Sequence, residues 1–244
     1  MAEISGRGTA ERVWRSWDRL GGLPLLALEG CEQAVVVAPH PDDEVLGAGG
    51  TLAELAAGGA TVAVLALTDG EASHPGASVA AGELARRRVA ESADAATRLF
   101  GEPPAIERLA LPDGKLDRYE DRIELALTDR LERGSWCFAP YRRDGHPDHE
   151  AAGRAASRAC AHAGARLIEY PIWLWHWSTP DDRAISWERA VRVRLGSGAH
   201  SRKQDAISAF ATQVAPLEEG PAGRAILPPH VLERFARLDE VLFA

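Results

Sequence analysis

Two short loops rich in histidine and aspartate carry the residues whose types and spacing could do chemistry. The first runs from Pro39 to Glu44 and holds one histidine and three acids within five positions. The second runs from Asp144 to His149 and again combines histidine, proline and aspartate. Prolines on either side of His40 restrict the backbone that presents its imidazole. A rigid corner of imidazole and carboxylate groups is what a divalent metal ion requires.

The ligand types in the two loops predict one metal site. His40, Asp43 and His149 supply two imidazoles and one carboxylate, a set that zinc uses for catalysis when a fourth position is left for water. The same set suits iron(II), so ligand type alone does not fix the metal. Helix capping by the acids explains one or two carboxylates but not His40.

The remaining polar residues of the loops have the chemistry that such a site needs. Asp42 could accept a proton from a metal-bound water, whose pKa zinc lowers towards about 7. His146, as an imidazolium, could stabilise an oxyanion or protonate a leaving amine. Asp148 could hold His146 in the correct tautomer. This constellation predicts hydrolysis of an amide.

The elements that position these loops are predicted from apolar runs and helical stretches that alternate along the chain. Strands are expected at residues 34–38, 61–67, 106–110, 136–139 and 166–170. Helices are expected at residues 47–57, 83–100 and 119–133, from after His149 to 163, and around 202–212 and 230–238. This alternation predicts an α/β fold with a mostly parallel sheet covered by helices. Both loops follow strands, so they should meet at the carboxyl edge of the sheet.

The chain is predicted to be one domain with an N-terminal addition. Residues 1–30 form a helical extension, in which residues 9–20 have helical spacing behind a possible Thr9 cap, and residues 31–244 form the single domain. Aromatic residues crowd the stretch from Tyr170 to Trp177. They are expected to pack in a core or a dimer contact, although stacking on a sugar ring or a lid stays open as an alternative.

Composition excludes several classes of function. Lys and Arg number 28 against 36 Asp and Glu, and no basic block marks a nucleic-acid surface. No apolar run is long enough for a membrane helix, and the N-terminus lacks an apolar signal core, so we expect a cytoplasmic protein without a membrane partner. The cysteines, Cys31, Cys137 and Cys160, have no paired spacing and are expected to be packing residues in a reducing compartment.

The two loops resemble the paired signatures of the LmbE-like, or PIG-L, metal-dependent N-deacetylases. Further resemblance comes from Thr68-Asp69-Gly70-Glu71 after the second strand, the pair Arg88 and Glu91, the loop Leu111-Pro112-Asp113-Gly114, and Lys203, Ala206, Thr212 and Gln213 near the end. The resemblance implies a Rossmann-like three-layer domain, a single zinc, and removal of an N-acetyl group from an amino sugar or a related small metabolite.

The resemblance also implies a role for each matching residue. The metal ligands would be His40, Asp43 and His149. Asp42 would be the general base, His146 the catalytic histidine, and Asp148 the acid that supports this histidine. Arg88 and Asp113 become candidates for binding substrate hydroxyls. Members that act on mycothiol carry a tyrosine where this chain has Asp144, which argues against that substrate.

Two other functions remain open at this stage. One is an iron(II)-dependent oxygenase using the two-histidine, one-carboxylate set, which the predicted α/β fold opposes because such enzymes normally use a β-sandwich. The other is a non-catalytic metal- or sugar-binding module. The expected partner is a small N-acetylated substrate, and a homo-oligomer is possible. His74, in a loop near the site, is expected to be solvated and is left out of the metal site.

Overall fold

The computed structural model describes residues 6–244, and these residues form a seven-stranded sheet with strand order β3-β2-β1-β4-β5-β7-β6. The strands are β1 (Gln33–Ala38), β2 (Thr61–Thr68), β3 (Ala105–Leu111), β4 (Trp136–Pro140), β5 (Arg166–Tyr170), β6 (Ala190–Arg194) and β7 (Asp239–Phe243). The first five pair in parallel, and β7 pairs antiparallel with both β5 and β6. The predicted mostly parallel sheet is confirmed.

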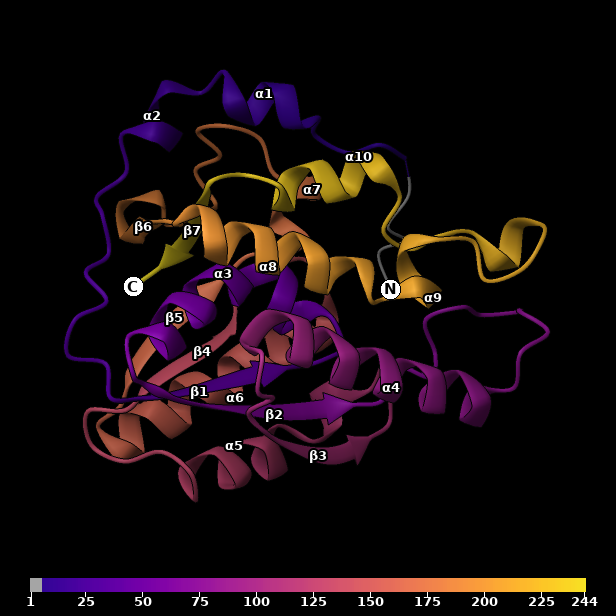
Figure 1. Ribbon diagram of the computed structural model, residues 1–244, viewed down its shortest axis with the longest axis horizontal. Helices are drawn as coiled ribbons and strands as arrows, with labels where there is room; N and C mark the ends of the chain where they lie inside the picture. Colours follow the sequence, from indigo (N-terminus) through magenta and orange to yellow (C-terminus); the bar gives the residue numbers. More distant parts are fainter. Residues whose placement is uncertain (1–5) are drawn as a thin grey trace.

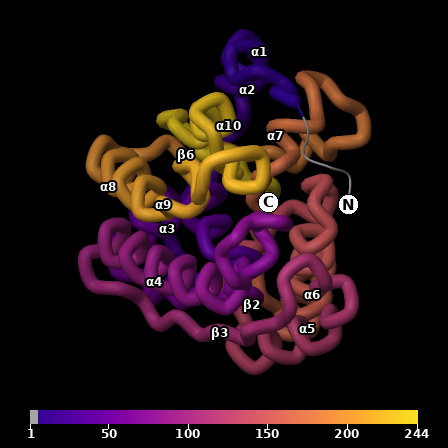
Figure 2. The backbone as a smooth tube through the Cα atoms, turned by 90° about the vertical axis from the view of Figure 1, so that its right-hand side faces the viewer, coloured from indigo at the N-terminus to yellow at the C-terminus, as the bar shows by residue number. Residues whose placement is uncertain are grey.

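Helices cover both faces of the sheet (Figures 1 and 2). The long helices are α3 (Asp43–Ala57), α4 (Ala81–Phe100), α5 (Glu120–Thr128), α6 (Pro147–Ala163) and α8 (Ser197–Ser208). The helices α3, α4 and α8 pack together on one face, while α5 and α6 pack together on the other. The three-layer α/β architecture is therefore as predicted.

Several shorter helices complete the chain. They are α1 (Glu11–Arg15), α2 (Asp18–Gly21), α7 (Leu174–Trp177), α9 (Ala211–Val214) and α10 (Pro229–Leu232), with 3₁₀ turns η1 (Leu116–Arg118), η2 (Trp187–Arg189), η3 (Pro221–Gly223) and η4 (Glu233–Phe235). Most of them lie in the C-terminal third, where Figure 1 shows them above the sheet and at its right-hand end.

The central strand β1 shows why the apolar runs of this sequence become strands. Successive side chains of a strand point to opposite faces. Val36 belongs to the core on the side of α3, whereas Val35 and Val37 belong to the core on the side of α6. Because both faces of the strand are buried, an unbroken run of valines fits it better than an alternation of apolar and polar residues.

The glycines at the start of α3 allow close packing of this helix. A Cβ at Gly47 would lie 2.1 Å from Cδ2 of Tyr170 on β5, and one at Gly50 would lie 2.3 Å from Cδ1 of Leu195. The Tyr170 hydroxyl also donates to the carbonyl of Val37, at 2.5 Å. The glycine run thus brings α3, with Asp43 in its first turn, close to the sheet.

The N-terminal extension differs in detail from its prediction. The expected helix over residues 9–20 is broken into α1 and α2, and Thr9 does not cap it, because its hydroxyl donates to the carbonyl of Ser178. The segment packs on the C-terminal part of the fold, where Trp14 is fully buried against Trp175. The division into an extension and one domain remains our proposal.

Several predicted boundaries were wrong. The helix expected at residues 47–57 begins at Asp43, and the helix expected to follow His149 begins at Pro147 and contains His149 in its first turn. The helix expected at residues 119–133 ends at Thr128. The helices expected around residues 202–212 and 230–238 are each divided in two, into α8 and α9 and into α10 and η4. Strands β6 and β7 were missed. The alternation of Val191 and Val193 with arginines is a strand pattern, but each strand has only five residues and pairs with a partner far away in the sequence.

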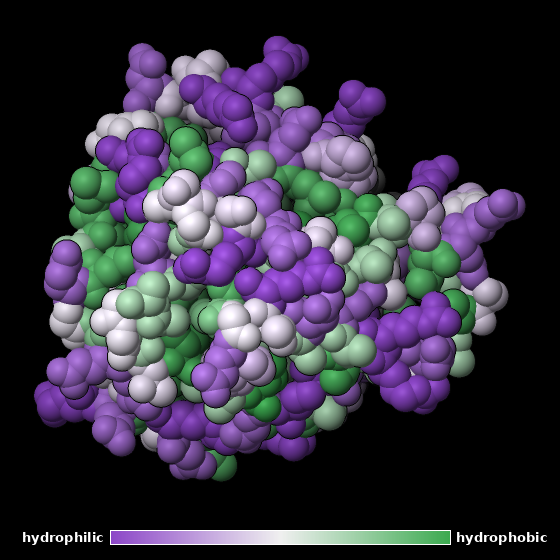
Figure 3. Space-filling view, in the orientation of Figure 1, coloured by the Kyte–Doolittle hydropathy of each residue, from purple (hydrophilic) through white to green (hydrophobic). Residues whose placement is uncertain are grey.

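The composition of the chain also bears on its surface, on the hydropathy of its helices and on its cysteines. In Figure 3 hydrophilic residues cover much of the visible face, with apolar residues interspersed among them. Among the described residues, no helix combines the length and the hydropathy needed to cross a membrane. Cys31, Cys137 and Cys160 are buried and free, as predicted for packing residues.

Candidate metal centre and active site

The two histidine-containing loops meet because the strands that precede them are neighbours. β1 pairs in parallel with β4, so residues that follow Ala38 and Pro140 emerge at the same edge of the sheet. Each loop then leads directly into a helix, α3 or α6. In open parallel sheets this edge, with its helix N-termini, is where ligands bind.

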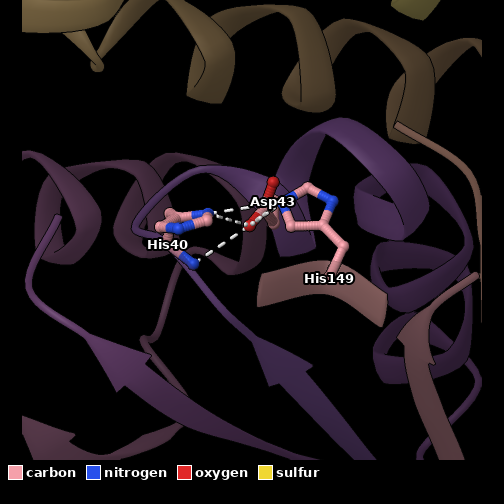
Figure 4. Close-up of side chains that lie close together, drawn as sticks. All are labelled: His40, Asp43 and His149. Carbon is pink, nitrogen blue, oxygen red and sulfur yellow. Dashed lines mark hydrogen bonds and ion pairs between the residues drawn. The ribbon is translucent and has the colours of Figure 1, made fainter. Parts of the chain in front are cut away.

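The three predicted metal ligands lie together with donor atoms at nearly equal distances (Figure 4). His40 Nδ1 lies 3.1 Å from Asp43 Oδ2. His149 Nε2 lies 3.2 Å from Asp43 Oδ2 and 3.3 Å from His40 Nδ1. Ligand atoms on a tetrahedral zinc ion with bonds of about 2.0–2.1 Å are about 3.3 Å apart. These three donors are spaced as ligands of one cation.

Carboxylates hold the other ring nitrogen of each histidine. His149 Nδ1 lies 2.7 Å from Asp144 Oδ2. His40 Nε2 lies 3.2 Å from both Asp148 Oδ2 and Asp113 Oδ1. Metal-binding histidines commonly donate their free N–H to a carboxylate, which fixes the tautomer and orients the ring. The donor set and its supports therefore fit a divalent metal ion.

Asp144 was missed as a site residue. In the sequence it stood out only because family members that act on mycothiol carry a tyrosine at this position. Its side chain is fully buried. Besides contacting His149, it accepts hydrogen bonds from the backbone N–H groups of Ile172, Trp173 and Leu174, at 2.8, 2.9 and 3.0 Å. Asp144 thus ties the start of α7 to a predicted metal ligand, a link between residues about thirty positions apart that local spacing does not show.

Asp42 lies beside the predicted metal ligands in a strained and braced conformation. Its φ of 146° is in a region that non-glycine residues rarely adopt. The buried Arg88 donates to Asp42 Oδ2 at 3.1 Å and to the carbonyls of Pro41 and Gly70 at 2.9 and 3.0 Å. Burial raises the pKa of Asp42 to about 7 against the opposing charge of Arg88. The pKa of this carboxyl group thus lies close to neutral pH.

His146 sits at the N-terminus of α6 and contributes to the same cluster. Its ring centroid lies 5.0 Å from that of His40 and 4.6 Å from that of His149. Its Nδ1 accepts a hydrogen bond from the backbone N–H of Asp148 at 3.2 Å, which places the ring proton on Nε2. Burial, with the neighbouring His149 and His40, lowers the pKa of His146 to about 3. The imidazolium expected from the sequence is therefore not favoured, because burial and the two neighbouring rings stabilise the neutral form of His146.

The predicted supporting acid, Asp148, is placed differently from expectation. Its carboxylate contacts His40 and accepts the backbone N–H groups of Gly114 and Leu116, at 2.8 and 3.0 Å. Its hydrogen bond with His146 runs through the Asp148 backbone instead of the side chain. The geometry therefore makes Asp148 a support for His40, a predicted metal ligand.

The cluster opens into a cavity of about 640 Å³. Its lining includes His40, Asp42, Asp43, Leu46, Ser73, His74, Arg88, Asp113, His146, Ile172, Trp173, Gln213 and residues 221–227 except Gly223. Both candidates for substrate contacts, Arg88 and Asp113, line this cavity. The expectation that His74 is solvated is wrong, because the loop folds over the cavity and buries this side chain.

Aromatic residues after Tyr170 divide between core and cavity. Trp175 and Trp187 are buried and pack with Trp14, as the packing interpretation predicts. Trp173 is also buried, but it lines the cavity. Trp177 is the more exposed ring and lies against Gly145 of the second loop.

A match to a protein-family model identifies the family of this chain. The PIG-L model, described as GlcNAc-PI de-N-acetylase, matches residues 35–160, just over half of the chain. The chain belongs to the PIG-L family. The resemblance inferred from the paired signatures is thereby confirmed, and the matched range contains every predicted ligand and catalytic residue.

Two curated relatives are deacetylases. Diacetylchitobiose deacetylase of Thermococcus kodakarensis is 34% identical over 137 residues, which cover 54% of this chain and 51% of that protein. The 1D-myo-inositol 2-acetamido-2-deoxy-alpha-D-glucopyranoside deacetylase of Rhodococcus erythropolis is 29% identical over 175 residues, 61% of this chain and 59% of that protein. The chain matches only about half of the length of these relatives.

Solved structures of related proteins share the fold. A conserved protein from Thermus thermophilus is 30% identical, with a TM-score of 0.56 over 75% of this chain and 80% of that one. The N,N'-diacetylchitobiose deacetylase from Pyrococcus horikoshii is 20% identical, with a TM-score of 0.61 over 86% of this chain and 78% of that one. At that identity the second likeness is evidence for the α/β fold alone.

Proposed function

We propose that this protein is a metal-dependent N-deacetylase that removes an N-acetyl or similar N-acyl group from an amino sugar or a related small metabolite. The observation that carries the proposal is the triangle of donor atoms from His40, Asp43 and His149, with Asp42 beside it in the cavity. Membership of the PIG-L family and relatives named as deacetylases of N-acetylated sugars support the same reaction.

The three ligands would hold zinc, with iron(II) as the alternative that the same donor set allows. When bound, the ion would supply Lewis-acid chemistry, polarising the amide carbonyl and making water a better nucleophile. Asp144 and Asp148 keep the imidazoles of His149 and His40 oriented for this role. Asp113 contributes to the same support of His40.

Asp42 acts as the general base. It lines the cavity next to the ligands, and Arg88 holds one of its oxygens. The carboxylate accepts a proton from the attacking water as the new bond to the carbonyl carbon forms. Asp42 then returns that proton to the amide nitrogen as the C–N bond breaks, so that acetate and a free amine leave.

His146 stabilises the developing charge on the carbonyl oxygen. Its Nδ1 is occupied by the backbone N–H of Asp148, so its Nε2–H is the group available for donation. His146 also lines the cavity in which the substrate is proposed to bind. Arg88 and Asp113 are proposed to bind substrate hydroxyls as well as to brace Asp42 and His40.

The test is amine release from a panel of N-acetylated amino sugars. Purified protein is assayed as isolated, after treatment with chelator, and after zinc or iron(II) is added back. Release that chelator abolishes and one metal restores is the expected result. Binding of a panel member without amine release by the metal-loaded protein would instead establish a non-catalytic sugar-binding module.

A further inference from the structure

Two buried side-chain nitrogens on the cavity wall make no hydrogen bond to any described residue. They are Nε of Arg88 and Nε2 of His74, and both residues line the cavity. Arg88 is already a candidate for a substrate contact, whereas His74 has no part in the proposed reaction. A buried polar atom that lacks a partner lowers stability, so its presence in a native structure calls for an explanation.

The loop that carries His74, between β2 and α4, is fixed from two directions. The backbone N–H of Ala72 donates to Asp113 Oδ2 at 2.9 Å. The backbone N–H of Ser78 donates to Glu218 Oε1 at 3.0 Å, and the Ser78 hydroxyl donates to the same carboxylate. In Figure 1 the loop before α4 and the segment after α9 accordingly lie one above the other at the right-hand end of the molecule. The loop is therefore held in place without any help from a substrate.

The imidazole of His74 has one nitrogen to offer to a ligand. The residue is only 6% exposed, and it lines the cavity. Its Nδ1 lies 3.0 Å from Ser73 Oγ, which leaves Nε2 for another group. Burial and the positive charge of Arg88 lower the pKa of the ring, and the backbone of Arg224 opposes them. The ring is therefore neutral near neutral pH.

A hydroxyl group is the partner that suits Nε2 of His74. The Ser73 hydroxyl can either donate to Nδ1 or accept from it. In the first case Nε2 of the neutral ring carries the proton and donates, and in the second case it accepts. A hydroxyl group both donates and accepts, so it satisfies Nε2 in either tautomer. A carboxylate or an ammonium group satisfies only one of the two.

His74 lies apart from the predicted metal ligands. Within the described residues, the side-chain hydrogen bonds and ion pairs of His40 and His149 go to aspartates and to one another. The neighbours of His74 are instead Ser73 and the backbone of Arg224. Because the reacting amide is proposed to lie at the metal ligands, a hydroxyl that reaches His74 belongs to another part of the substrate.

We propose that His74 is a substrate-contacting residue whose Nε2 exchanges a hydrogen bond with a hydroxyl group of the bound substrate, on the part that keeps the amine nitrogen. This inference rests on the proposed function for the identity of the substrate. In the free protein the unpaired nitrogen lowers stability, and the bound hydroxyl supplies the missing partner. His74 thus serves binding at a cost in stability, as residues of binding sites often do.

The first experiment combines loss of the imidazole with loss of single hydroxyl groups. Methyl glucosaminide and its 3-, 4- and 6-deoxy analogues are titrated by calorimetry into the metal-loaded protein, so no turnover is needed. We expect one deoxy analogue to bind the wild type about tenfold more weakly than the parent sugar. His74→Phe, which keeps a ring but removes both nitrogens, should bind that analogue and the parent equally. The same preference in the wild type and in the variant overturns the inference.

Rescue by a polar side chain separates a hydrogen bond from a change of shape. His74→Gln keeps a donor and an acceptor, so it should retain more of the preference for the parent sugar than His74→Phe. His74→Leu, which also lacks a polar atom, replaces the phenylalanine variant if that variant does not fold. A preference that is lost equally in the glutamine and apolar variants contradicts the hydrogen bond.

Unfolding in denaturant tests the role of His74 without any sugar. Because His74→Phe removes an unpaired buried nitrogen, its unfolding midpoint should equal or exceed that of the wild type. The matched control is His162→Phe, at an exposed histidine of α6. A midpoint that falls further than in the control shows that the imidazole serves packing, and this overturns the inference. Failure of all four sugars to bind the wild type counts against the proposed function, and unfolding then decides the role of His74.

Discussion

The part of the chain within residues 35–160 and the part after it contribute to one cavity in different ways. The first part places polar groups at the ends of the parallel strands β1 and β4, where the backbone is fixed by pairing on both sides. The second part adds antiparallel strands, short helices and segment 221–227, which contributes residues to the cavity lining. The difference is that the predicted metal ligands follow paired strands of the sheet, whereas much of the remaining cavity lining comes from loops and short helices outside it.

The largest effect is expected from removing a metal ligand. His149→Ala leaves two donors of the three, so bound metal is lost and activity falls below detection. Metal content after loading and dialysis measures this directly. The control is His162→Ala, an exposed histidine at the other end of the same helix, α6. Stoichiometric metal in the His149 variant would break the assignment of the site.

A large effect without loss of metal is expected at Asp42. Asp42→Asn keeps the size of the side chain but removes its basicity, so kcat should fall by about 10²–10⁴-fold. Metal content should match that of the wild type. Asp117→Asn, on the exposed surface, is the matched control. Near-normal turnover in the Asp42 variant would rule out its role as base.

The next largest effect is expected at His146. His146→Ala removes the donor proposed to face the carbonyl oxygen, so kcat should fall by about 10²-fold or more. Because its Nδ1 accepts the Asp148 backbone N–H, His146→Gln tests whether an amide can replace part of the donation. An unchanged rate in a folded alanine variant would remove His146 from the mechanism.

A smaller effect is expected at Asp144, the residue that joins the two parts of the chain. Asp144→Asn replaces one carboxylate oxygen with an amide N–H₂, which cannot accept a hydrogen bond from His149 or from the backbone N–H groups of α7. The orientation of His149 and the start of α7 should therefore both be disturbed. Metal affinity should fall by about 10–100-fold. Asp121→Asn, at an exposed position, is the control. Unchanged metal affinity would show that this carboxylate serves only the α7 backbone.

The smallest effect on turnover is expected in the N-terminal extension. Trp14→Ala removes a fully buried side chain and should lower the free energy of unfolding by about 3–5 kcal/mol. Well below the melting temperature, kcat should not change, because Trp14 packs away from the cavity against Trp175 and Trp187. Denaturant unfolding checks the stability, with the exposed Leu25→Ala as control. Two separate transitions would show that the extension folds independently.

Local patterns were sufficient for some residues and not for others. His40 and Asp43 lie three positions apart after a strand, and the second loop repeats their chemistry, so the cluster of His40, Asp43 and His149 could be predicted before the fold was known. His74 could not be placed, because its burial depends on a loop held by Glu218, 140 positions away from Ser78. Strands β6 and β7 were missed for a similar reason, since each is short and depends on a distant partner.

By itself the sequence determined the parallel sheet, the order of its first five strands along the chain, and the donor types of the predicted metal site. These follow from hydrophobic runs, helix punctuation and ligand chemistry, all of which act over short stretches of chain. Only the tertiary structure decided that Asp144 supports His149, that Asp148 supports His40, and that residues from segment 221–227 line the cavity. Those are contacts between residues far apart in sequence, and they exist only once the sheet has brought its loops together.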